Sequence, residues 1–203
     1  MKIIKEACIQ SIEEAKYFIN KKIDRFETCS NLLKGGLTPN IELFNYIKDN
    51  SDIHQVVMIR TNDGFEVTEE EILAMVIQIK ELKKLGATEF IFGFIKNKEI
   101  DIPACEKLID AIGDSCKYDF HMAIDSLANY ERDIPILINM GFNRILTKGG
   151  ENPAVQNIGS LNSIIKKYGH KIQIIIGGSV TKDNYQEIVS LTNATQVHGT
   201  KIL

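Results

Sequence analysis

The sequence predicts a single-domain α/β fold, a parallel (β/α)8 or TIM barrel, on three observations. Eight short apolar or β-branched runs alternate with amphipathic stretches that have helical spacing. The strand–helix unit recurs at intervals of roughly 20 to 35 residues, which is typical of βα barrels. A doubly wound open sheet is the runner-up, but no GxGxxG turn follows any of these runs. Because no linker or low-complexity tract interrupts the pattern, residues 1–203 are expected to form one domain.

The individual elements follow in chain order. Strands are expected at 3–8, 25–29, 55–60, 89–94, 117–121, 143–148, 172–177 and 195–199. Helices are expected near 11–21, 40–49, 69–85, 103–112, 130–140, 154–168 and 182–191. Helix 69–85 has the clearest signals, because Thr68 can cap it, acidic residues fill its first turn and Gly86 follows its end.

Only residues 200–203 follow the last expected strand. They leave no room for an eighth helix, so the outer groove beside the last and first strands should lack its usual cover. We expect the chain to form a homo-oligomer, a dimer, through this region or a neighbouring face, because large apolar patches are unusual on the surface of a monomer.

The composition excludes several classes of function. The net charge is -3, so no basic footprint indicates nucleic-acid binding. No run of about 18 apolar residues could span a membrane, and the first residues do not have the pattern of a signal peptide. The cysteines have neither CxxC nor zinc-ribbon spacing, so Cys8, Cys29, Cys105 and Cys116 are expected to be free thiols in the cytoplasm.

Function in a βα barrel is located at the C-terminal ends of the strands and in the loops that follow. The same Glu-x-Cys pattern ends the first two strands, as Glu6-Ala7-Cys8 and Glu27-Thr28-Cys29. Residues two apart on a strand face the same side, so each Glu points the same way as its Cys. We expect one polar cavity at this end of the barrel, lined by Glu6, Cys8, Glu27, Cys29, Arg60, His121 and His198.

An enzyme would use these groups for acid–base chemistry on a small phosphorylated or carboxylated substrate. His121 is the preferred acid or base, because an ordinary His titrates near neutral pH. Glu6, Glu27 and Asp125 are the other catalytic candidates. The anionic group would bind to Arg60 and to residues that follow the last three strands, namely Gly149, Gly150, Gly177, Gly178, His198, Gly199 and Thr200.

A structural interpretation of the same residues stays open. Glu6 and Glu27 could form a buried ion-pair network with Arg25 and Arg60, since buried charges need partners. Cys8 and Cys29 could simply be small core residues, which is the usual role of a buried free cysteine.

Taken in order, these motifs resemble those of the CutC family, the copper homeostasis proteins. The resemblance covers the whole chain and is carried by Glu6-Ala7-Cys8, Glu27-Thr28-Cys29, Gly35-Gly36-Leu37-Thr38-Pro39, Met58-Ile59-Arg60, Phe120-His121-Met122-Ala123-Ile124-Asp125, Leu146-Thr147-Lys148-Gly149-Gly150, Gly177-Gly178-Ser179-Val180 and Val197-His198-Gly199-Thr200. The sequence departs from the family in its short loop 61–65 and in Met122, where many members have Arg.

The resemblance implies a cytoplasmic barrel, often dimeric. It also implies that Cys8 and Cys29 match the cysteines proposed to bind Cu(I) in the family. Soft thiolates favour Cu(I), so a copper-binding function is chemically reasonable. Two functions therefore remain open, copper binding and an enzyme acting on a small anionic molecule.

Overall fold

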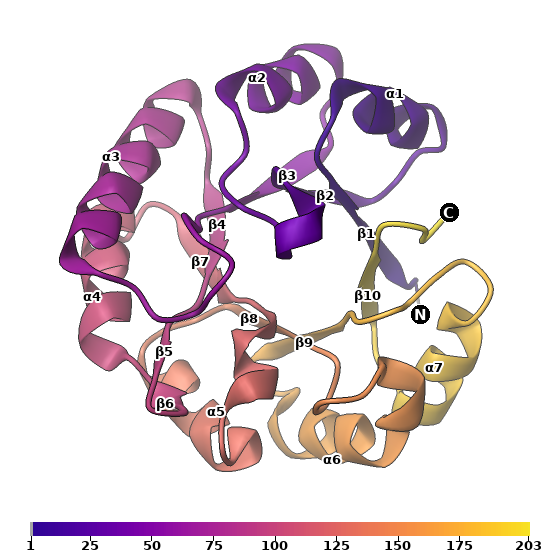
Figure 1. Cartoon of the computed structure of the whole chain (residues 1–203). Coiled ribbons are helices and arrows are strands. Elements are labelled where there is room, and N and C mark those ends of the chain that lie inside the picture. The colour runs from indigo at the N-terminus through magenta and orange to yellow at the C-terminus, as the bar shows by residue number, and fades with distance from the viewer. Residues whose placement is uncertain (1) are drawn as a thin grey trace.

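The structure is a computed structural model that describes residues 2–203. Within these residues, eight parallel strands close into a barrel in the order β1-β10-β9-β8-β7-β4-β3-β2 (Figure 1). The barrel strands are β1 (Ile4–Ile9), β2 (Arg25–Thr28), β3 (His54–Met58), β4 (Glu89–Phe92), β7 (Lys117–Phe120), β8 (Arg144–Thr147), β9 (Gln173–Ile176) and β10 (Gln196–Gly199). The predicted (β/α)8 barrel is confirmed, and the open-sheet alternative is wrong.

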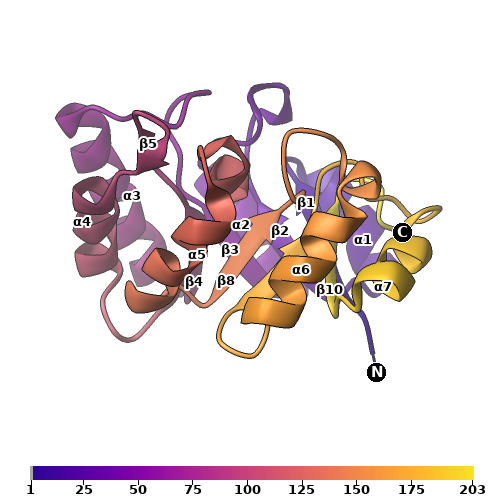
Figure 2. The same ribbon diagram turned by 90° about the horizontal axis from the view of Figure 1, so that it is seen from below.

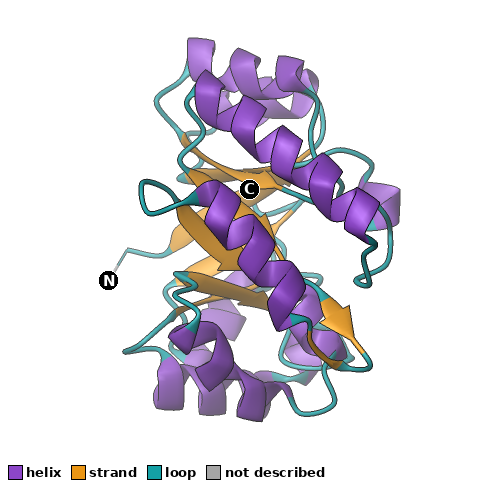
Figure 3. Ribbon diagram, turned by 90° about the vertical axis from the view of Figure 1, so that its left-hand side faces the viewer, coloured by secondary structure: helices purple, strands orange, loops and turns teal. Residues whose placement is uncertain are grey.

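Helices surround the barrel strands, as Figure 3 shows with the strands in orange between the purple helices. They are α1 (Ile12–Asn20), α2 (Ile41–Asn50), α3 (Glu69–Leu85), α4 (Ile102–Ile112), α5 (Tyr130–Asn139), α6 (Ile158–Tyr168) and α7 (Tyr185–Thr192). Helix α3 begins at a capping box, in which the Thr68 side chain accepts a hydrogen bond from the Glu71 N–H and the Glu71 carboxylate accepts one from the Thr68 N–H. It ends at Gly86, whose φ of 102° suits a glycine.

Short elements that the sequence did not predict lie in the loops between strands and helices. Strands β5 (Ile95–Lys96) and β6 (Glu99–Ile100) form a hairpin between β4 and α4. Short 3-10 helices follow β2, β7 and β8, at Leu32–Lys34, Met122–Ser126 and Ala154–Gln156. The β5 hairpin and the N-terminus lie on opposite sides of the molecule (Figure 2).

The inside of the barrel is filled in layers. An apolar layer, which includes Val56, Met58, Ile91, Leu146 and Ile175, forms a buried cluster with Cys8 and Cys29. A second and larger apolar core lies between the barrel wall and the helices.

A buried layer of charged residues occupies the N-terminal half of the barrel interior. Arg144 forms ion pairs with Glu89 and Asp119, and its Nη1 lies 3.8 Å from Glu6 Oε2. The Arg25 Nε donates to Glu6. The structural interpretation of the sequence is thus correct for Glu6 and Arg25, although their further partners are residues it did not include.

No helix follows β10 in the part of the chain that the structure describes, as expected. Residues Thr200–Leu203 instead continue along the barrel rim, where Lys201 pairs with Thr181 and Ile202 is buried. A groove of about 510 Å³ remains beside α1, where Tyr17 and Leu203 line it. None of the helices within residues 2–203 is long and apolar enough to cross a membrane.

Candidate functional site

A cavity of about 630 Å³ opens at the C-terminal ends of the barrel strands. Eight of the candidate residues line it, namely Cys8, Glu27, Arg60, His121, Gly178, His198, Gly199 and Thr200. The other candidates do not line it, namely Glu6, Cys29, Asp125, Gly149, Gly150 and Gly177. The Glu-x-Cys pattern and the two strand-end histidines therefore predicted the location of the cavity. Of the predicted glycines, Gly149, Gly150 and Gly177 lie outside its lining.

Cys8, which lines the cavity, is in contact with Cys29, which is buried behind it. Their Sγ atoms are 3.7 Å apart, and the Cys8 thiol also lies 3.3 Å from Glu27 Oε1, to which it donates. The barrel register places Cys8 opposite Glu27, and Cys29 lies two residues further along the chain, directly after the end of β2. Contact with Cys29, burial and the Glu27 charge raise the pKa of the Cys8 thiol well above its ordinary value, so the thiol is protonated at neutral pH.

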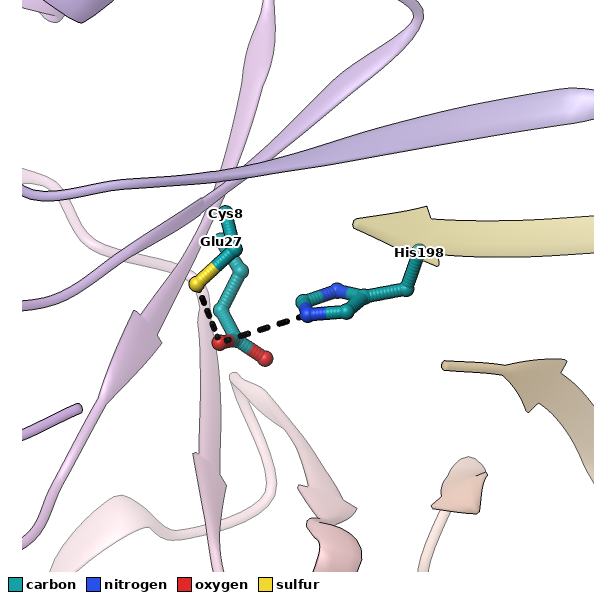
Figure 4. Close-up of side chains that lie close together, drawn as sticks. All are labelled: Cys8, Glu27 and His198. Carbon is teal, nitrogen blue, oxygen red and sulfur yellow. Dashed lines mark hydrogen bonds and ion pairs between the residues drawn. The ribbon is translucent and has the colours of Figure 1, made fainter. Parts of the chain in front are cut away.

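His198 lies between two carboxylates. It pairs with Glu6 across the contact of β1 and β10, and its Nδ1 lies 2.9 Å from Glu6 Oε1. Its Nε2 is 4.0 Å from Glu27 Oε1 (Figure 4). Burial by itself lowers the pKa of His198, but the Glu27 charge and the bond to Glu6 outweigh it, so the net shift is upward.

Glu27 has bonding capacity that the chain does not use. Its Oε1 accepts from Cys8, but its buried Oε2 has no hydrogen-bond partner among residues 2–203. Burial raises its pKa, and the nearby charges of His198 and Arg144 only partly offset this. A buried carboxylate oxygen without a partner is costly, so this atom is a candidate for contact with a ligand.

His121 is a neutral imidazole, contrary to the expectation that it titrates near pH 7. Burial and the positive charge of Arg60 lower its pKa to about 3. Its Nδ1 accepts a hydrogen bond from the Ala123 N–H at 3.2 Å, so the proton is on Nε2. Of the two candidate histidines, His198 is therefore the one whose pKa is shifted upward, which favours its protonated form.

Arg60 holds two loops together, which differs from its expected role as an anion ligand. Its guanidinium donates to the carbonyls of Lys34, Gly35 and Gly36 on one side and of Asp63 and Gly64 on the other. It also lies 4.9 Å from the centre of the Phe65 ring. Gly35 allows this close approach, because a Cβ there would lie 2.9 Å from Arg60 Nη1. The guanidinium donors are occupied by the chain and are not free for an anion.

Asp125 occupies the amides that were expected to bind an anion after β8. Its carboxylate accepts from Thr147 Oγ1 at 2.5 Å and from the N–H groups of Lys148, Gly149 and Gly150 at 2.9 to 3.1 Å. Asp125 is therefore bonded to the β8 loop rather than facing the cavity, and this part of the predicted anion site is filled by the chain itself.

Other positive groups at the rim were not identified from the sequence. Lys34 and Lys201 line the cavity together with Ser179, Gly199 and Thr200. Both lysines are exposed, and an exposed lysine carries no pattern in a sequence that distinguishes it from other surface lysines.

The buried charges Glu89, Asp119 and Arg144 were also missed, although a signal existed for them. Each is a buried residue of a barrel strand and has a buried apolar residue directly after it in the sequence. A charged residue at such a position indicates a buried ion pair, because an unpaired charge there would be strongly destabilising.

Comparisons with known proteins concern the family and the fold of the chain. The sequence profile of the CutC family matches residues 3–203. A CutC family protein from Aliivibrio fischeri is 34% identical over 98% of this chain and 81% of its own length. The human copper homeostasis protein cutC homolog is 31% identical over 95% of this chain and 71% of its own length. The crystal structure of the putative copper homeostasis protein CutC from Streptococcus agalactiae superposes with a TM-score of 0.92, at 30% identity, over 99% of this chain and 100% of that one.

Proposed function

Because the chain belongs to the CutC family, we propose that it is a copper homeostasis protein that binds Cu(I) through Cys8 and Cys29. The observation that supports this proposal is the 3.7 Å separation of the two Sγ atoms, one of which, that of Cys8, belongs to a residue lining the cavity. Thiolates are the soft ligands that select Cu(I), and two of them form a linear site. Cytoplasmic reducing conditions would keep both thiols available.

Binding requires a small rearrangement and the loss of two protons. An ion bound linearly between two thiolates, at a metal–sulfur bond length of ~2.3 Å, separates the sulfurs by ~4.6 Å, so the two sulfurs must move apart slightly. Both thiols are buried, and the pKa of Cys8 is raised, so Cu(I) must displace each thiol proton to solvent. Affinity should therefore rise with pH.

The test is competition for Cu(I) against a chromogenic chelator. Wild type should bind one Cu(I), and both Cys8→Ser and Cys29→Ser should weaken binding by more than about 100-fold, because a single thiolate remains. Cys116→Ser is the matched control, since its half-buried thiol contacts the Ala87 carbonyl and has neither Cys8 nor Cys29 as a partner. Equal affinity in all four proteins would reject copper binding at this site.

A second candidate function is an enzyme acting on a small anionic molecule. The observation that favours it is the placement of His198 between Glu6 and Glu27 at the wall of a cavity with two lysines at its rim. A raised pKa makes His198 a general acid, and the cavity size suits a metabolite. Screening phosphorylated and carboxylated metabolites by thermal shift tests this function, and His198→Gln should remove turnover of any substrate found.

A further inference from the structure

A second set of donor atoms lies beside the two sulfurs. Cys8 Sγ, Glu27 Oε1 and His198 Nε2 point toward one another from β1, β2 and β10 (Figure 4), and donor atoms of these three residues all lie within 4.8 Å of one another. Sγ is 3.3 Å from Oε1, and Oε1 is 4.0 Å from Nε2. In a tetrahedral complex with bonds of ~2.0–2.3 Å, neighbouring donor atoms are ~3.3–3.8 Å apart. The three donors thus need only small shifts to share one ion.

Glu6 orients the imidazole for such a role. Its Oε1 lies 2.9 Å from His198 Nδ1, which leaves Nε2 directed toward Cys8 and Glu27. Glu6 is fixed in turn by the Arg25 Nε. A carboxylate that holds the second nitrogen of a histidine is the usual outer partner of a metal-bound imidazole, where it fixes the tautomer and increases basicity.

Two further observations point to a ligand at this position. Glu27 Oε2 is buried and has no hydrogen-bond partner within the described part of the chain, so this oxygen is available to a ligand. Cys8, Glu27 and His198 also all line the cavity, so an ion between them would face open space on one side. Structural zinc sites are closed by four protein ligands, whereas three ligands and one open position are typical of catalytic sites.

We propose that Cys8, Glu27 and His198 bind a divalent cation of the zinc type, with the fourth coordination position open to the cavity. Sulfur, imidazole and carboxylate ligands together suit borderline-soft Zn²⁺. The ion replaces the proton of the Cys8 thiol, which leaves to solvent, and binds the unprotonated Nε2 of His198. The fourth position takes water or an anionic group of a small molecule. This site does not depend on Cu(I) binding, but it shares Cys8 with the proposed copper pair, so the two ions exclude each other.

The experiment uses Co²⁺ as a spectroscopic probe for Zn²⁺ on the purified, chelator-treated full chain. We expect one Co²⁺ per chain, a thiolate-to-cobalt charge-transfer absorption, and displacement of Co²⁺ by Zn²⁺. The absorption should disappear in Cys8→Ser. Affinity should fall by more than about 100-fold in Glu27→Gln and His198→Asn, and by about 10- to 100-fold in Glu6→Gln, which removes only an outer partner.

Cross-comparison with Cu(I) distinguishes this site from the copper pair. Cys29→Ser should leave Co²⁺ affinity within about threefold of wild type and weaken Cu(I) binding. Glu27→Gln should weaken Co²⁺ binding and leave Cu(I) affinity within about threefold of wild type. Loss of Co²⁺ binding without an effect on Cu(I), in Glu27→Gln, supports the site even if Cys29→Ser shows that copper binds elsewhere.

Other outcomes would overturn the proposal. They are the absence of a thiolate absorption in wild type, or a Cys29→Ser variant that loses Co²⁺ as strongly as Glu27→Gln does. Circular dichroism checks that each variant folds. If a buried variant does not fold, the wild-type absorption, its stoichiometry and the Cys29→Ser result still decide the question.

Discussion

At the scale of single residues, the buried polar groups around the barrel mouth are of two kinds. Arg60 is bonded to main-chain carbonyls, and Asp125 to main-chain N–H groups and the Thr147 hydroxyl, so both hold loops in place. Glu27 and His121 each keep one buried polar atom that finds no partner among the residues described. Glu27 and His121 both line the cavity, where a ligand can compensate for the desolvation of these two atoms.

Asp125→Ala should destabilise the fold without affecting Cu(I) binding. The variant leaves the N–H groups of Lys148, Gly149 and Gly150 without their charged acceptor, so we expect the free energy of unfolding to fall by about 3 kcal/mol. Urea unfolding measures this change, with Asp114→Ala, an exposed aspartate, as the control. Unchanged stability together with lost binding would instead place Asp125 in the functional machinery.

Residue positions could be predicted from the sequence better than residue roles. Strand alternation predicts which face of the strand a side chain points to, and the strand-end rule predicts which end of the barrel carries the site. Together they identified Cys8, Glu27 and His198 as cavity residues. They do not determine bonding partners. His121 and His198 have equivalent positions at strand ends, yet one lies beside the Arg60 cation and the other between two carboxylates, and only the folded structure reveals this.

At the scale of elements, the register between strands decides which groups meet. Each Glu-x-Cys pair faces inward as predicted, but β1 and β2 are offset so that Cys8 lies opposite Glu27 rather than Cys29. Closure of a barrel requires such a stagger. The sequence carries no direct signal for it, because both cysteine positions satisfy the same alternation. The offset is what places a carboxylate within reach of a thiol and an imidazole.

Helix α3 offers a test of local stabilisation away from the site. Thr68→Ala removes the side chain that accepts from the Glu71 N–H, and the free energy of unfolding should fall by about 1 kcal/mol. Thr68→Ser keeps the hydroxyl and should remain within about 0.5 kcal/mol of wild type. Chemical denaturation measures both variants. An equal loss in the two would mean that the hydroxyl does not contribute to stability.

At the scale of the whole molecule, the charged layer inside the barrel makes stability depend on pH. Burial alone would raise the pKa of Glu89, but the hydrogen bond with His54 and the charge of Arg144 outweigh it and hold the pKa at about 2. A lowered pKa means that the ionised form stabilises the fold above pH ~4.3, and that this contribution is lost as the pH falls toward 2.

Glu89→Gln should therefore reduce stability at pH 7 and flatten its decline in acid. The amide keeps the shape but removes the charge that pairs with Arg144. Thermal melting between pH 7 and pH 2.5 measures the difference, with Glu99→Gln, an exposed glutamate, as the control. Parallel pH curves for wild type and Glu89→Gln would show that this carboxylate is not responsible.

Self-association of the chain remains a prediction. The groove beside α1, lined by Tyr17 and Leu203, is the surface that the sequence led us to expect to be uncovered. Static light scattering at tens of micromolar should give the mass of a dimer, and Tyr17→Glu should shift it toward the monomer. A monomer at that concentration in wild type would contradict the prediction.

The hydrogen bond between Glu6 and His198 joins the first and the last strand of the barrel. During synthesis, β1 and β2 leave the ribosome long before β10. Cys8 and Glu27 can therefore meet His198, which lies on β10, only after nearly all of the sequence between them has been made. Such a distant pairing is slow to form, since a loop of almost the entire chain length must close first. An ion bound between β1, β2 and β10 would link the first and last strands only after the barrel has closed. It would therefore lower the rate of unfolding far more than it changes the rate of folding.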